Sequence, residues 1–187
     1  SSKIIEINYK IEFAKLNIGV VAWTLDINDS DLGYSSYINV KSKGMVSGLY
    51  SFEGNYSSKG RINKSGVFIS EYYSQVWKTK KKKKLVEISF VNSSVSGFSI
   101  YPKETVEPKI KYLDLNELND PISSFINIVF GKKNNNSTID GRRVYKMLVK
   151  NEGGTLEKYI VIADFVNIWK DHARNDLEYI YFEMPSK

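Results

Sequence analysis

The stretch IEINYKIEF, residues 5–13, carries an apolar side chain at every odd position and a polar side chain at every even position through Glu12. Successive side chains of a β-strand point to opposite faces, so this pattern predicts a strand with one buried face and one face in water. The same period of two dominates much of the remaining chain. We therefore expect a mainly β protein.

Further strand-like segments follow, separated by turns rich in glycine or asparagine. They span residues 20–27, 34–44, 49–62, 67–78, 84–92, 142–150, 157–165 and 177–184. The segment at 49–62 is either a plain strand or one with a bulge at Gly54. Turns are expected at residues 16–19, 28–33 and 63–66, and a flexible hairpin loop at 151–157.

Two segments lack a strand pattern. Residues 95–118 contain Pro102 and Pro108 and show little periodicity, so we expect a surface loop or a poorly paired edge there. Residues 132–138 (KKNNNST) are expected to form a polar loop.

One helix is indicated between these segments. Asp120 is a good N-cap residue and Pro121 suits the first helical position. Gly131 is expected to end the helix. Its apolar face is expected to carry Ile122, Phe125, Ile126 and Val129.

These elements predict a single domain over residues 1–187. Eight to ten short strands joined by tight turns favour an antiparallel meander. With one short helix, the expected fold is a strongly curved antiparallel sheet or a partly open β-barrel, with the helix plugging or flanking it.

The amino-acid composition excludes some classes of function. Cysteine is absent, which excludes disulfides, thiolate catalysis and cysteine zinc sites. No run approaches about 18 apolar residues, so no membrane-spanning helix is expected. The apolar pattern begins by Ile4 without a basic leader, which fits a cytosolic chain or an exported chain whose signal peptide has been removed.

Four motifs occur in a familiar order: IEFAKLNIGVVAWTLDI (11–27), KSKGMVSGLYSFEGNYSSKGRI (41–62), NDPIS (119–123) and IDGRRVYKMLV (139–149). With them the chain resembles, from about Ile5 to Phe182, the bacterial family known as domain of unknown function 3108. Two features depart from that family: the cysteines near the DGRR motif are absent, and the closing C-terminal strand is missing after Met184.

The resemblance implies an exported, periplasmic protein of the Gram-negative cell envelope, whose signal peptide has been removed. It implies no established activity. A curved sheet around an apolar hollow would look similar to periplasmic lipid- and lipoprotein-binding half-barrels, an analogy of fold alone.

The strongest charge feature is the lysine run Lys80, Lys81, Lys82, Lys83 and Lys84. With Lys78 it accounts for the whole net charge of +6, because the remaining chain holds 21 basic and 21 acidic residues. We interpret the run chiefly as a solvated hairpin turn, which also discourages edge-to-edge association. Its alternative role is a peripheral contact with anionic membrane. No nucleic-acid partner is expected, because aromatic residues do not interleave with these lysines.

The DGRRVY motif is expected to place Asp140 and Gly141 in a turn. Arg142 and Arg143 would then point to opposite faces of a strand and serve different neighbours. We interpret them chiefly as structural, with one pairing with an acidic residue inside or at the rim of the sheet, and the alternative is a rim site for an anionic headgroup. His172, with Asp171 and Asp176, is a weak candidate for metal binding or acid–base chemistry, because no second histidine exists. We expect no catalytic residue, no metal and no cofactor.

Aromatic residues on the strands suggest either an ordinary core or the lining of a hollow for an apolar ligand. The candidate ligand-binding residues are Tyr9, Phe13, Trp23, Tyr73, Trp77, Phe90, Arg142 and Arg143. The function expected first is a non-enzymatic envelope protein that binds a lipid-like ligand, or an extended peptide along an open sheet edge. A structural or protein-interaction module of the envelope is second, and a hydrolase acting on an envelope polymer is third.

Overall fold

The computed structural model describes residues 2–13, 16–43, 48, 51–111, 115–151, 158–169 and 179–183. Seven strands form the first sheet in chain order, as an antiparallel meander. They are β1 (Ser2–Phe13), β2 (Leu16–Asn28), β3 (Gly33–Ser42), β4 (Phe52–Ile62), β5 (Phe68–Thr79), β6 (Lys83–Val91) and β7 (Ser94–Tyr101). The meander expected from the period of two is confirmed for these strands.

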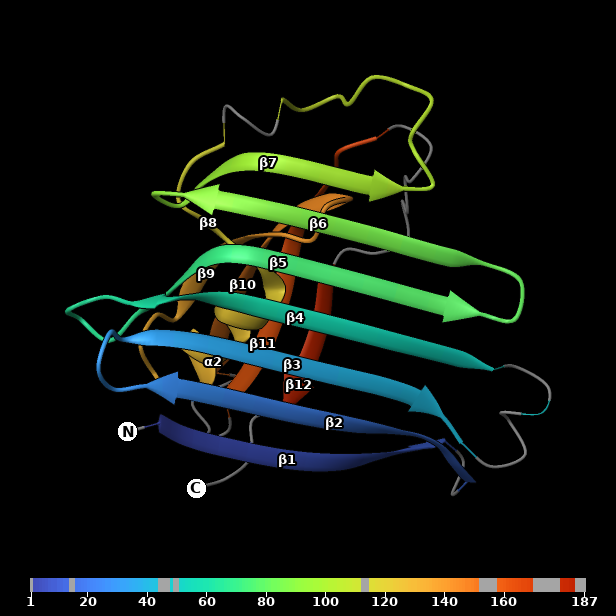
Figure 1. Ribbon diagram of the computed structural model, residues 1–187, viewed down its shortest axis with the longest axis horizontal. Helices are drawn as coiled ribbons and strands as arrows, with labels where there is room; N and C mark the ends of the chain where they lie inside the picture. The colour runs from blue at the N-terminus through green and yellow to red at the C-terminus, as the bar shows by residue number, and fades with distance from the viewer. Residues whose placement is uncertain are drawn as a thin grey trace.

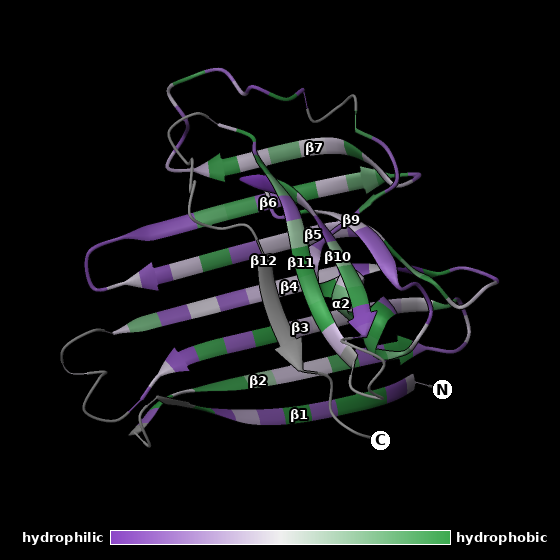
Figure 2. Cartoon of the chain, turned by 180° about the vertical axis from the view of Figure 1, so that it is seen from behind, coloured by the Kyte–Doolittle hydropathy of each residue, from purple (hydrophilic) through white to green (hydrophobic). Residues whose placement is uncertain are grey.

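The remaining strands build a second sheet instead of extending the first. They are β8 (Leu118–Asn119), β9 (Asn135–Ile139), β10 (Arg143–Asn151), β11 (Lys158–Asn167) and β12 (Tyr179–Glu183), in the order β12-β11-β10-β9-β8, with β8 parallel to β9. The helix α2 (Pro121–Val129) packs against β5 of the first sheet and β9 of the second. In Figures 1 and 2 the second sheet and the helix lie over one face of the first sheet, and β10, β11 and β12 cross its strands steeply. The fold class is as expected: mainly β, with an open antiparallel sheet and one short helix.

No helix in the described part of the chain is long and apolar enough to cross a membrane.

The strand register divides the inner face of the first sheet, the face toward the helix, into transverse rows. One row, which we call the covered row, joins Ile5, Leu25, Ser36, Ser58, Tyr73, Ile88 and Phe98 across the seven strands. Leu25, Ser58 and Ile88 in this row are 0% exposed. The covered row is therefore sealed by the helix and the second sheet.

A second inner row lies four residues further along each strand, and we call it the open row. It joins Tyr9, Val21, Val40, Gly54, Trp77 and Lys84. Tyr9 is 49% exposed, Val21, Val40 and Trp77 are half-buried, and Lys84 is exposed. Burial of this face thus falls off with distance from the helix.

A buried carboxylate joins the helix to the first sheet. Asp120, the N-cap of α2 as expected, accepts hydrogen bonds at Oδ1 from the backbone N–H of Ile122 and Ser123. Its Oδ2 accepts from the hydroxyls of Ser58, Ser70 and Ser123, at 2.6–2.7 Å. Five donors on one fully buried carboxylate satisfy it and fix where the helix sits.

Two expectations about elements are wrong, and a third holds only in part. Residues 94–101 form β7, which lies at an edge of the first sheet, as one alternative expected, but is paired along its length with β6. A bulge that shifts the β6–β7 register between Ser89 and Phe90 hides this strand from a period-two pattern. Residues 135–139 form β9, not a polar loop, because Asn136 and Thr138 are buried against polar side chains of the helix. Residues 16–19 are paired in β2, not a turn.

The helix also differs from a simple amphipathic one. Besides Ile122 and Ile126, it buries Ser123, Ser124 and Asn127. These polar side chains bond to the two sheets, so most of the circumference of α2 faces protein. The residues 151–157 expected as a loop lie, from 152 onward, outside the described residues.

Candidate functional site

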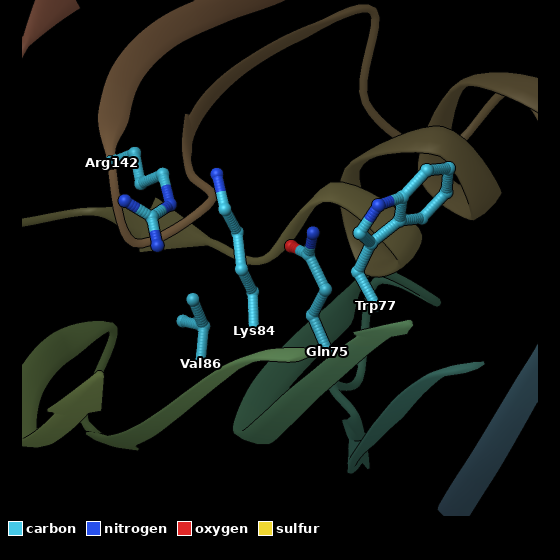
Figure 3. Close-up of a pocket in the computed structure, with 5 residues that line it drawn as sticks. All are labelled: Gln75, Trp77, Lys84, Val86 and Arg142. Atoms are coloured by element: carbon cyan, nitrogen blue, oxygen red, sulfur yellow. The ribbon is translucent and has the colours of Figure 1, made fainter. Parts of the chain in front are cut away.

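A pocket of about 200 Å³ opens on the inner face beside the open row. Its lining residues are Gln75, Trp77, Lys84, Val86 and Arg142. Figure 3 shows the side chains of Lys84, Gln75 and Trp77 rising side by side from β5 and β6, with Lys84 nearest to Arg142 and Trp77 furthest from it. Two neighbouring strands thus form the floor, and a turn from the second sheet forms the wall.

The DGR turn is held firmly over this floor. Asp140 Oδ1 accepts hydrogen bonds of 2.8 Å from the backbone N–H groups of Arg142 and Arg143. Gly141 has a φ of 94°, and a Cβ there would lie 2.4 Å from Cγ1 of Val86. Only glycine meets both demands, so the turn can rest on Val86 and present Arg142 to the pocket.

The positive charges of the pocket are unequally compensated. Arg142 Nη1 donates to Glu104 Oε1 at 3.0 Å, and both side chains are 16% exposed. Lys84, in contrast, has no ion pair within the described residues. Desolvation lowers the pKa of Lys84, and the charges of Arg142 and Lys82 lower it further, while Glu104 works in the other direction. Lys84 is therefore a cation of the pocket without a counter-charge among the described residues, and an anion would supply that charge.

An aromatic wall adjoins these cations. The Trp77 ring stacks on Phe52, with ring centroids 5.1 Å apart and planes at 16°. A side chain at Gly54 would meet both Tyr56 and Trp77, so these rings close over the glycine. The side of the pocket toward the open row is therefore flat and apolar.

The size of the pocket limits its occupant. Pockets that enclose a drug-sized ligand hold about 300–1,000 Å³, more than the 200 Å³ here. A phosphate or carboxylate group with a few attached carbons fits this volume, and a longer chain does not.

The structure brings together two of the expected site residues, Trp77 and Arg142, in this pocket. Trp23, Tyr73 and Phe90 instead belong to the main core, where each is at most 6% exposed. The helix α2 and the second sheet cover these three side chains. Trp23 Nε1 also donates a hydrogen bond of 2.8 Å to Ser36 Oγ.

The other expected residues lie apart from the pocket. Tyr9 lies in the open row, four strands away from Trp77. Phe13 ends β1, and its side chain lies outside the described residues. Arg143 begins β10 and pairs with Asp140 at 3.6 Å. The expectation that the two arginines serve different neighbours is confirmed, although Arg142 lies in the turn and not on the strand.

The lysine run forms the β5–β6 turn, as expected. Thr79 N donates to Lys82 O at 2.8 Å, and Lys80 Nζ donates to Gly48 O at 2.9 Å. All five lysines are exposed. Lys84 differs from the rest because its side chain faces the pocket. His172, Asp171 and Asp176 lie outside the described residues.

Sequence reasoning missed Lys84 as a pocket residue, together with Gln75, Val86 and Glu104. One signal was available: Lys84 lies two residues before the buried Val86 and so on the same face of β6. The Arg142–Glu104 pair had no signal, because 38 residues separate the partners and Glu104 lies in the aperiodic segment 95–118.

Comparisons with protein-family models, with curated proteins and with solved structures each found no match. The resemblance to domain of unknown function 3108, and the periplasmic location it implies, stay predictions.

Proposed function

We propose that the protein is a non-enzymatic binding protein for an amphipathic anion, such as a lipid-like molecule with a phosphate or carboxylate headgroup. The observation that carries this proposal is the pocket in which Lys84, without an ion pair among the described residues, lies near Arg142, whose charge acts on it. Its setting would be the cell envelope.

The headgroup would take the place of the missing counter-charge. A charge-assisted hydrogen bond from an ammonium to a phosphate or carboxylate oxygen is roughly twice as strong as a neutral one. Lys84 loses hydration in the pocket, so an anion at its Nζ restores a favourable environment for the charge. Because Lys84 remains partly in water, salt should weaken the binding.

The apolar part of the ligand would lie against Trp77 and continue along the open row. Val21 and Val40 are half-buried neighbours in that row, and Tyr9 ends it. An acyl chain over these side chains would remove their remaining apolar surface from water, at about 25 cal/mol for each Å² covered.

A titration with dodecyl phosphate below its micelle concentration tests the proposal. Trp23 and Trp169 are buried and Trp77 is half-buried, so a change in tryptophan emission would report chiefly on the pocket. We expect saturable binding of one molecule, confirmed by native mass spectrometry, that weakens as salt is added.

Dodecanol serves as the matched probe, because it keeps the chain and lacks the charge. Binding of dodecanol as tight as that of dodecyl phosphate would overturn the assignment of the cations. No binding of either probe would instead favour the second candidate, a protein-interaction module whose half-exposed open row receives a partner.

A further inference from the structure

The outer face of the first sheet carries a row of lysines that the strand register assembles from distant segments. Lys10, Val20, Lys41, Glu53, Lys78 and Lys83 are successive cross-strand neighbours from β1 to β6. Each lies five residues from a member of the covered row, and therefore on the opposite face. We call this set the basic row.

The lysines of the basic row are exposed, and most of their charge is uncompensated. Glu53 pairs with Lys41 at 3.4 Å. Lys10, Lys78 and Lys83 have no ion pair among the residues that the structure describes. Adjacent strands lie about 4.8 Å apart, so six strands extend the row over roughly 24 Å.

The β5–β6 turn continues this positive surface at one end. Lys81 and Lys82 are exposed beside Lys83, and the turn is fixed by Thr79, whose Oγ1 accepts from the backbone N–H of Lys82 at 3.1 Å. The neighbouring outer row, from Asn8 to Tyr101, carries no charge: its members are Asn8, Ala22, Asn39, Asn55, Val76, Leu85 and Tyr101. Most lysines of this face are therefore gathered at one end, and Lys59 lies apart from them on β4, paired with Ser35 and Tyr72.

Apolar side chains adjoin the lysines at the same end. Val76, Leu85 and Tyr101 are cross-strand neighbours, and Tyr101 is 57% exposed. A basic stripe beside exposed apolar and aromatic side chains matches the border between lipid headgroups and acyl chains, where tyrosine is favoured. The basic row itself holds no aromatic side chain on which a nucleic-acid base could stack.

We propose that the basic row and the β5–β6 turn form a docking surface for an anionic lipid bilayer. Lysines near such a surface are attracted to its headgroups without specific geometry, and salt screens the attraction. Lys83 docks while its neighbour Lys84 faces the pocket, so the bound protein would hold the pocket close to the headgroup layer. The surface does not depend on the proposed ligand.

The test is sedimentation of the full chain with vesicles of phosphatidylcholine alone and of phosphatidylcholine mixed equally with phosphatidylglycerol. The protein should bind the mixed vesicles at low salt and dissociate at high salt. Replacing Lys10, Lys78 and Lys83 together by serine should weaken partition into mixed vesicles roughly 100-fold, since each lysine contributes about fivefold.

The matched control replaces Lys59, Lys64 and Lys133 by serine, which removes the same charge from other exposed positions. This control should bind nearly as well as the unmodified protein. An equal loss in both triple variants would overturn the proposal, because net charge alone would then explain binding. Failure to bind mixed vesicles, or displacement from them by single-stranded DNA, would also overturn it.

Lys84→Ala distinguishes this inference from the proposed function. The substitution should weaken binding of dodecyl phosphate at least about tenfold and leave most of the vesicle binding intact. A loss of vesicle binding as large as that of the basic-row variant would assign membrane contact to the pocket face and contradict the docking surface.

Discussion

The covered row and the open row occupy one face of one sheet, yet they differ in burial. Both follow the same alternation along β2 to β6, and only four residues separate them on each strand. The covered row is sealed because Asp120, the N-cap of α2, bonds to Ser58 in that row and to Ser70 nearby on β5. The open row lies beyond that contact, and it keeps a pocket and half-exposed apolar side chains.

The difference shows that a β-strand pattern fixes which side chains share a face, whereas the packing of another element decides which part of the face is sealed. In this protein the sealing contact is polar. Three serines and an aspartate place the helix, and apolar side chains such as Leu25 and Ile88 fill the space around it.

The largest expected effect comes from removing that polar contact. Asp120→Ala removes the helix cap and the carboxylate that accepts from the buried hydroxyls of Ser58 and Ser70, which leaves them only their weaker contacts with Ser123 Oγ and Asn119 Oδ1. We expect a loss of about 4 kcal/mol in the free energy of unfolding, measured with urea. Asp31→Ala is the control, because Asp31 caps only an exposed turn at Gly33 N. A similar, small loss in both variants would show that the network does not seal the covered row.

A pair of truncations compares the two rows directly. Leu25→Ala, in the covered row, should cost about 3 kcal/mol because it opens a cavity in packed core. Val21→Ala, on the same strand in the open row, should cost less than about 1 kcal/mol, since Val21 is only half-buried. Equal losses in urea unfolding would mean that the open row is as firmly packed as the covered row.

The pH dependence of the free energy of unfolding reports on Asp120, the carboxylate that seals the covered row. Burial raises the pKa of the Asp120 carboxyl above its ordinary value of 3.8, and hydrogen bonds from Ser123, Ser70 and Ser58 limit the rise. The folded protein then binds this proton more tightly than the unfolded chain does. Its contribution to stability is present below pH 3.8 and declines as pH rises through the folded pKa.

Asp120→Asn removes this titration while keeping a side-chain acceptor for the N–H groups of Ile122 and Ser123. Stability of the unmodified protein should therefore fall more steeply from pH 4 upward than that of the variant, in urea unfolding at several pH values. Parallel curves would contradict a raised pKa at Asp120.

Much of the fold could be predicted from the sequence because the local signals are strong. Local residue patterns predicted the strand at 5–13, the turn at 63–66 and the helix start at Asp120–Pro121. The structure confirms all three. The strands β7 and β9 could not be predicted. A bulge interrupts the alternating pattern of β7. The polar side chains Asn136 and Thr138 are buried in β9, so its sequence has the polar pattern of a loop.

The candidate site was predictable only in part. Trp77 and Arg142 were expected to contact a ligand, but nothing local shows that Arg142 reaches the inner face of the first sheet. That placement depends on Gly141 resting on Val86, a contact across 55 residues of sequence. The division of the aromatic residues between core and pocket likewise depends on where the helix packs.

Two adjacent lysines of one run provide the most direct test of an anion site on the inner face. Lys83 and Lys84 carry the same charge on the same strand and point to opposite faces of it. Binding of dodecyl phosphate, followed by tryptophan emission below the micelle concentration, should fall at least about tenfold in Lys84→Ala, because a charge-assisted hydrogen bond contributes roughly 1.5–3 kcal/mol. Lys83→Ala should bind as the unmodified protein does. Equal binding by the two variants would contradict an anion site on the inner face.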